Sequence, residues 1–169
     1  QYDYEEARDT SEQWMYMPAL KKLKRVLSDS GSGPRTGTLF GSEIAYEDIE
    51  QRNLDDYEHT LVGEESLDGR AVYVLESRPK SARRAKTSYG KSKTWVSKKT
   101  YLALKNELYD HKGVLVKTFF FKDIQEIGGI WISRKMAVVN HRNSRMSMLA
   151  LKKLAVNPPI DQAIFDTRV

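Results

Sequence analysis

Val114–Val139, VLVKTFFFKDIQEIGGIWISRKMAVV, decides the fold class. Two strand-length runs rich in β-branched and aromatic residues flank the Gly128-Gly129 pair, and such an arrangement is typical of a β-hairpin. Neither run shows the 3.6-residue period of an amphipathic helix. We therefore predict two antiparallel strands, Val114–Gln125 and Ile130–Val139, joined by a tight turn.

The same succession of strand-like runs and turn residues continues on both sides of this hairpin. The further units are Thr60–Ser66, Asp68-Gly69 and Arg70–Ser77; Tyr101–Asp110 and Lys112-Gly113; and Asn140–Asn143 followed by Ser144–Leu154. Turns that recur at short intervals, with no helical pattern between them, predict a β-meander. The fold class is therefore mainly β (α+β), with an antiparallel meander.

Two shorter runs precede the meander. Gln13–Met17 and Leu20–Leu27 are predicted as strands joined through Pro18-Ala19. The leucines of the second run also match a helical period, and Pro18 suits the first turn of a helix, so a helix there is the alternative.

Short helical segments are expected near both ends of the meander. Ser28–Ser42 is a Gly/Ser-rich loop, and Ser42 is the expected N-cap of a helix over Glu43–Gln51, with Ala45 and Ile49 on its apolar side. Two further caps are expected: Asn53 for a turn from Leu54 to Tyr57, and Asp161 after Asn157-Pro158-Pro159, which ends the last strand.

Several strands carry apolar residues on both faces. In the Val114–Gln125 strand, alternation places Val114, Val116 and Phe120 on one side and the remaining apolar residues, Leu115, Phe119 and Phe121, on the other. A one-sided sheet has a polar outer face. Either helices and loops cover the second face, as in an ordinary core, or the sheet curls around a ligand.

Composition and net charge limit the classes of chemistry and partner that the protein can have. The chain has no cysteine, a formal net charge of +5 and no apolar run long enough to span a bilayer, so thiolate chemistry and disulfides are excluded. The net charge favours anionic surfaces, although lysines that protect strand edges give the same balance.

The usual signatures of catalysis are absent. His59, His111 and His141 have no metal-ligand spacing. The acidic pairs Glu47/Asp48 and Asp55/Asp56 are interpreted either as solvated helix faces or as first-turn partners of a helix dipole. No catalytic residue, metal or cofactor is predicted. Cations near aromatic residues form no nucleic-acid motif, so no nucleic-acid partner is predicted.

Several segments together resemble the outer-membrane lipoprotein-sorting protein group of the LolA/LolB-like superfamily. The segments are Gln13–Lys22 (QWMYMPALKK), Phe40-Gly41-Ser42, Ala45–Asp48 (AYED), Arg52–Tyr57 (RNLDDY), Gly63-Glu64-Glu65, Asp68-Gly69, Trp95–Lys98 (WVSK) and Tyr101-Leu102. Between them they extend over most of the chain.

The resemblance implies a strongly curved half-barrel whose concave face is partly covered by short helices, in a periplasmic protein whose signal peptide is removed or lies outside this sequence. We expect a polar segment at 1–12 and a single domain at 13–169, without the helix and first strands that usually precede the QW segment in the family. The expected partners are a lipid or an acylated lipoprotein, with an inner-membrane exporter or an outer-membrane acceptor.

The function predicted on this basis is non-enzymatic binding of acyl chains in lipid or lipoprotein traffic. The rivals are an envelope-stress or exporter-associated sensor that uses the same half-barrel, and a scaffold whose concave side is filled. The predicted apolar-cavity residues are Met15, Met17, Phe40, Tyr46, Ile49, Leu54, Trp95, Leu102, Leu104, Phe119, Phe121, Trp131, Met136, Met146 and Met148. Lys80, Arg83, Arg84 and Lys86 are the predicted contacts to anionic surfaces, with a solvated loop as the alternative.

Overall fold

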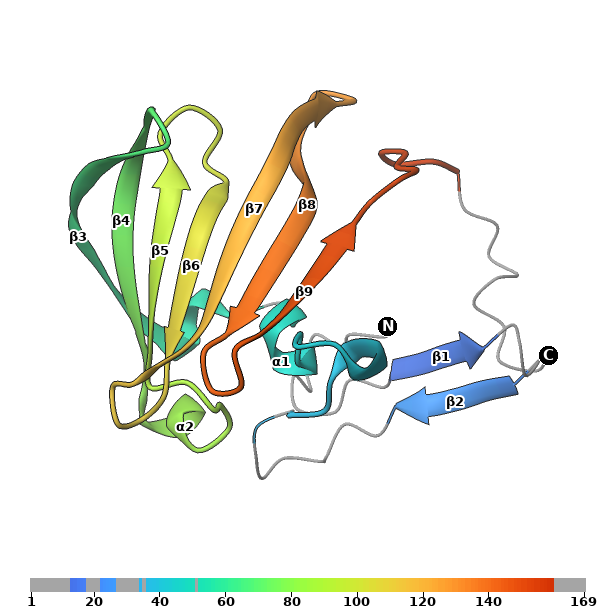
Figure 1. The fold of residues 1–169 in the computed structure, drawn as a ribbon, viewed down its shortest axis with the longest axis horizontal. Coiled ribbons are helices and arrows are strands. Elements are labelled where there is room, and N and C mark those ends of the chain that lie inside the picture. Colours follow the sequence, from blue (N-terminus) through green and yellow to red (C-terminus); the bar gives the residue numbers. More distant parts are fainter. Residues whose placement is uncertain (1–12, 18–21, 27–33, 35, 51, 160–169) are drawn as a thin grey trace.

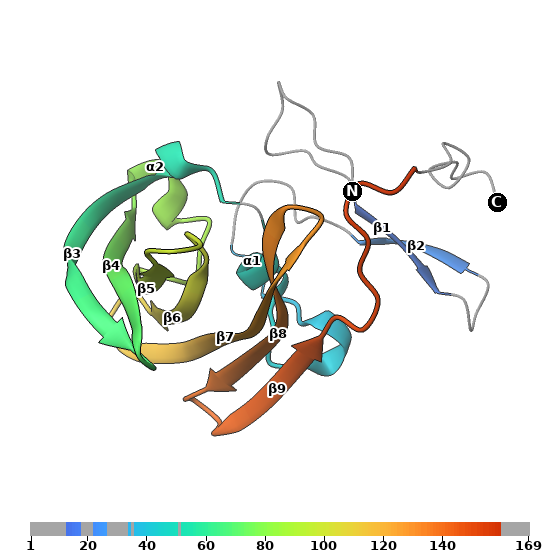
Figure 2. The ribbon, with the colours of Figure 1, turned by 90° about the horizontal axis from the view of Figure 1, so that it is seen from above.

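The central element is a seven-stranded antiparallel sheet in which every strand pairs with its neighbours in sequence (Figure 1). The computed structural model describes residues 13–17, 22–26, 34, 36–50 and 52–159. The strands of the sheet are β3 (Tyr57–Leu67), β4 (Arg70–Pro79), β5 (Lys91–Ser97), β6 (Ala103–Tyr109), β7 (Leu115–Ile127), β8 (Ile130–Asn140) and β9 (Arg145–Ala150). Figure 2 shows how the strands sweep round a curve from β3 to β9 without closing into a barrel. The predicted β-meander is confirmed.

Residues with positive φ make the tight turns. Asp68 and Gly69 have φ of 51° and 74°, and Gly128 and Gly129 have φ of 59° and 79°. Two consecutive residues in this left-handed region match the right-handed twist of the strands they connect. The predicted hairpin turns are therefore confirmed, and they fix which strands pair.

A register shift in β7 changes which side chains share a face. Tyr109 pairs with Leu115 and Leu108 with Lys117, so Val116 has no partner of its own on β6. Val116 therefore packs in the same buried cluster as Phe119. The simple alternation that assigned these two residues to opposite faces is wrong at this point, because a bulge adds one residue to the strand.

Two buried clusters lie on opposite faces of the sheet. One consists of Ile44, Tyr89, Leu108, Val116, Phe119 and Val138. The other consists of Val72, Val74, Trp95 and Leu104, with Leu67 and Ile124 packed against it. The strand register shows that the two clusters are on different faces. Trp95 and Phe120 both pair with Lys105, so these three residues share a face. Phe119, the neighbour of Phe120, therefore lies on the other face. The meander thus has apolar contacts on both sides.

The helical segment before the meander is shorter than predicted. α1 spans Tyr46–Ile49, and its N-cap is Ala45 rather than Ser42. The Ala45 N–H donates to Asp48 Oδ2 at 2.7 Å, whereas Ser42 Oγ accepts from the Ile44 N–H at 3.2 Å in the turn before it. Because a carboxylate three residues ahead satisfies Ala45, the helix starts later than the serine suggests. Ala45 is buried, but Ile49 is 49% exposed.

The other short helical segments are a 3-10 turn η2 (Leu39–Gly41), a second 3-10 turn η3 (Leu54–Asp56), and α2 (Ser81–Arg84). Asn53 caps η3 as predicted, since its side chain accepts from the Asp55 N–H at 3.3 Å. α2 lies where a solvated loop was the alternative, between β4 and β5.

The two runs before the meander form a separate hairpin. β1 (Gln13–Met17) and β2 (Lys22–Val26) pair antiparallel, so the strand prediction is confirmed and the helical alternative is wrong. At the other end of the meander, β9 stops at Ala150 rather than at Leu154. The turn predicted at Asp161 lies outside the described residues.

Candidate functional site

An open cleft lies at one end of the sheet. In an antiparallel meander, alternate turns gather at the same end, and here the β3–β4 turn, the β5–β6 connection and the β7–β8 hairpin do so. The cleft has a volume of about 560 Å³, within the range of small-ligand sites. It is lined by Gly69, Arg70, Ala71, Ser97, Lys98, Lys99, Thr100, Ile124 and Trp131. We call this site the end cleft.

Two contacts link separate elements of the sheet around the end cleft. Lys122 Nζ on β7 lies 3.1 Å from Asp68 Oδ2 in the β3–β4 turn, although β5 and β6 separate their strands. Lys99 Nζ lies 5.8 Å from the centroid of the Trp131 ring, a cation–π contact between the β5–β6 connection and β8. The curvature of the sheet therefore brings an apolar wall and a cationic rim together.

One polar group in the end cleft has no partner. Thr100 Oγ1 is buried, and it forms no hydrogen bond with any residue that the structure describes. The Thr100 backbone is fixed nevertheless, since its N–H donates to Ser97 Oγ at 3.2 Å. Buried hydroxyls without a partner are uncommon because desolvation is then uncompensated.

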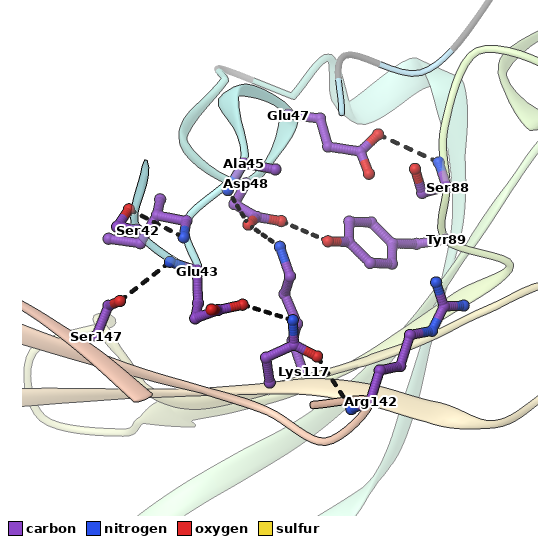
Figure 3. Close-up of polar contacts among 12 residues, drawn as sticks. Ser42, Glu43, Ala45, Glu47, Asp48, Ser88, Tyr89, Lys117, Arg142 and Ser147 are labelled. Carbon is purple, nitrogen blue, oxygen red and sulfur yellow. Dashed lines mark hydrogen bonds and ion pairs between the residues drawn. The ribbon is translucent and has the colours of Figure 1, made fainter. Parts of the chain in front are cut away.

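A buried polar network attaches α1 to the opposite face of the sheet (Figure 3). The Asp48 side chain is fully buried, and its carboxylate accepts from Tyr89 OH and from Lys117 Nζ, each at 2.6 Å. Lys117 lies on β7, and Tyr89 lies in the connection between α2 and β5. One carboxylate therefore joins three segments that are far apart in sequence.

Two glutamates extend this network, and their pKa values are shifted in opposite directions. Glu43 Oε2 accepts from Asn140 Nδ2 at 2.6 Å and from Asn143 Nδ2 at 3.1 Å, and these hydrogen bonds, that of Asn140 first, lower the pKa of Glu43. Glu47 Oε2 accepts the Ser88 N–H at 3.1 Å, and burial raises the pKa of Glu47 by more than the hydrogen bonds from Ser88 lower it. Burial therefore dominates and raises the pKa of Glu47.

Sequence reasoning missed this network. The interpretation of Glu47 and Asp48 as a solvated helix face is wrong, because both side chains are buried. The alternative, acidic residues in the first turn of a helix, agrees with their position in α1. A usable signal was present in β7: Lys117 stands two residues before Phe119 on the face that packs under α1. A lysine on an apolar face requires a buried acceptor. The network holds α1 in place, and all three carboxylates are engaged in it.

The predicted apolar-cavity residues do not gather around one cavity. Among them, Trp131 is the one that lines the end cleft as the structure describes it. Trp95 and Leu104 belong to the buried cluster on the face of the end cleft, whereas Phe119, with Phe121 and Met136 packed against it, belongs to the cluster under α1. Their assignment to acyl chains stays a prediction.

The remaining predicted residues lie elsewhere. Phe40 is 84% exposed, Leu54 72%, Met146 66% and Met148 67%, and Tyr46 and Leu102 are partly buried. Met15 and Met17 lie on β1, and their side chains are outside the description. Of the predicted cations, Lys80 and Arg84 are exposed, Lys86 is partly buried, and Arg83 Nε donates to Tyr57 OH at 3.2 Å.

The described residues contain no group of three or more histidine or carboxylate side chains arranged to hold a metal ion. None of the helices in the described ranges has the length and apolar character needed to cross a bilayer.

Comparison with known proteins identifies structural relatives. A family model described as "Uncharacterized protein" matches residues 1–169, and a search of curated proteins gives no match. A crystal structure of a domain assigned as an outer membrane lipoprotein-sorting protein, from Vibrio parahaemolyticus, is 32% identical with a TM-score of 0.75; the match covers 92% of this chain and 63% of that one.

Two further structures are similar. A DUF1329 family protein from Desulfovibrio piger is 32% identical with a TM-score of 0.68, and the match covers 90% of this chain and 64% of that one. A LolA superfamily protein from Nitrosomonas europaea, 24% identical with a TM-score of 0.58, shares the fold over 85% of this chain and 64% of its own length. The chain thus spans less than two thirds of the length of these relatives.

Proposed function

We propose that this chain, which is similar to a lipoprotein-sorting domain and shares its fold with a LolA superfamily protein, is a periplasmic, non-enzymatic carrier domain that binds the acyl chains of a lipid or lipoprotein. The observation that carries the proposal is the end cleft, in which Ile124 and Trp131 offer an apolar wall on a rigid sheet. Each methylene buried there contributes about 0.8 kcal/mol. A few methylenes per chain are enough for reversible binding.

The distribution of polar groups supports binding rather than catalysis. Asp48 is engaged with Lys117, Glu43 with Asn140, and Glu47 with the Ser88 amide. These carboxylates lie on the face under α1, and none of them lines the end cleft. The carrier role therefore draws on shape and apolar area, with no proton transfer required.

Lipid that co-purifies with the protein tests this function. The protein is purified without detergent and extracted with organic solvent, and the extract is analysed by mass spectrometry. We expect a stoichiometric lipid or acylated species with the wild type. Its loss is expected in Ile124→Trp, because Ile124 lines the end cleft on the face of Val72 and Trp95, and a larger ring there would fill it.

Thr60→Trp is the matched control, since Thr60 is an exposed β3 residue that does not line the end cleft. A folded wild type with no bound lipid would overturn the proposal in favour of a filled scaffold. Equal lipid content in the two tryptophan variants would overturn the assignment to this cleft.

A further inference from the structure

The charged residues that line the end cleft are all cationic. Arg70, Lys98 and Lys99 are among its lining residues, and no carboxylate is. Lys98 is already paired with Glu64 and lies over the Tyr73 ring. Arg70 and Lys99 form no ion pair with any carboxylate that the structure describes, so two cations at the rim are available to an anion.

Thr100 also lines the end cleft, but its hydroxyl oxygen is buried within the wall and is not exposed to the cleft. The groups that can contact an anion are therefore the side chains of Arg70 and Lys99. The two cations form a site for an anionic headgroup.

The other part of the end cleft is apolar. Ile124 packs against the cluster of Val72, Val74, Trp95 and Leu104, and Trp131 lies beside it in the lining. A free phosphate ion would leave this wall in contact with water, whereas a phosphate that carries acyl chains would cover it. The ligand that matches both parts is amphiphilic.

We propose that the end cleft recognises the phosphate headgroup of an anionic phospholipid, with Arg70 and Lys99 at the phosphate and Ile124 and Trp131 against the chains. This inference rests on the proposed carrier function and narrows its ligand class. It also separates the end cleft from the Lys80–Lys86 cations, which lie in and around α2 rather than at the rim.

Calorimetric titration with short-chain lipids tests the proposal. The probes are dihexanoyl phosphatidylglycerol, which is anionic, dihexanoyl phosphatidylcholine, which is zwitterionic, and inorganic phosphate, all at concentrations below micelle formation. We expect the anionic lipid to bind about tenfold more tightly than the zwitterionic one, because a choline group would lie among uncompensated cations. Inorganic phosphate is expected to bind far more weakly than either lipid.

Variants assign the headgroup contacts. The double variant R70Q/K99Q should abolish the preference for the anionic lipid. Lys112→Gln, in the turn at the opposite end of the sheet, removes the same type of charge and should have no effect.

The outcomes separate this inference from the carrier function. Equal affinity of the wild type for the two lipids, or an unchanged preference for the anionic lipid in R70Q/K99Q, would overturn the headgroup assignment and leave the carrier proposal standing. Binding of inorganic phosphate as tight as that of the anionic lipid would reduce the site to an ion site. A failure of both lipids to bind, together with the absence of co-purified lipid, would overturn both proposals.

Discussion

Lys117 Nζ lies 2.6 Å from Asp48 Oδ2, and both side chains are almost completely removed from solvent. Asp48→Asn would leave the lysine charge buried without a countercharge, so we expect the free energy of unfolding to fall by about 3–5 kcal/mol. Urea denaturation followed by circular dichroism measures the change. The pair joins α1 to β7, so the loss should appear as a lower midpoint with an unchanged slope.

An exposed ion pair provides the control. Lys122 and Asp68 are 3.1 Å apart but largely solvent-exposed, and Lys122→Gln should cost less than about 1 kcal/mol. If the two variants lose similar amounts of unfolding free energy, burial does not explain the contribution of the Asp48–Lys117 pair to stability.

Glu43 should stabilise the fold at neutral pH. The hydrogen bonds from Asn140 and Asn143 lower its pKa below the ordinary value of 4.5, so the folded state favours the carboxylate. This stability is present above the unfolded-state pKa and is lost as the pH falls through the folded-state pKa. Glu43→Gln should therefore be less stable than the wild type at pH 7, and the difference should shrink in acid. Thermal melts across the acidic range measure it, and a constant difference would contradict the assignment.

Glu47 should show the reverse dependence. Burial raises its pKa above 4.5, so the stability associated with its protonated form is fully present below the unfolded-state pKa and lost as the pH rises through the folded-state pKa. Glu47→Gln keeps an oxygen that can accept the Ser88 N–H. The stability of the variant relative to the wild type should increase as the pH rises from about 4 to 8, as measured by the same thermal melts. A relative stability that increases as the pH falls would contradict the assignment of the shift to burial.

Gly90 is required because the backbone approaches it closely. A Cβ built at Gly90 would lie 2.8 Å from the Cα of His111 and 2.9 Å from the carbonyl oxygen of Asp110. Gly90→Ala should therefore destabilise the protein by about 1–3 kcal/mol, in the manner of an overpacked core. Gly63→Ala, where a Cβ meets no atom within 4 Å, should be close to neutral in the same urea titration.

The sequence predicts the meander well because its turns are local. Gly128-Gly129 and Asp68-Gly69 have positive φ within the turn itself, so the signal and the structure occupy the same few residues. The buried clusters are harder to predict, since the position of Val116 depends on a bulge that is defined by the pairing of β6 with β7.

The polar contacts are the least accessible to sequence reasoning. Asp48 and Lys117 are 69 residues apart, and neither local charge pattern indicates that the other is near. The end cleft has the same difficulty, because its lining comes from two connections and from four strands. Trp131 was recognised as a binding residue by its type, whereas Thr100 is distinguished only by a missing partner.

The two margins of the sheet are chemically unequal. Within the described residues, β3 and β9 each have one neighbouring strand in the sheet. β3 carries exposed glutamates, including Glu58, Glu64 and Glu65, which discourage pairing with another chain, whereas β9 presents Met146 and Met148 to solvent. An added strand would face glutamate charges at the β3 edge and flexible methionine side chains at the β9 edge. Pairing of an added strand is therefore less unfavourable at the β9 edge than at the β3 edge.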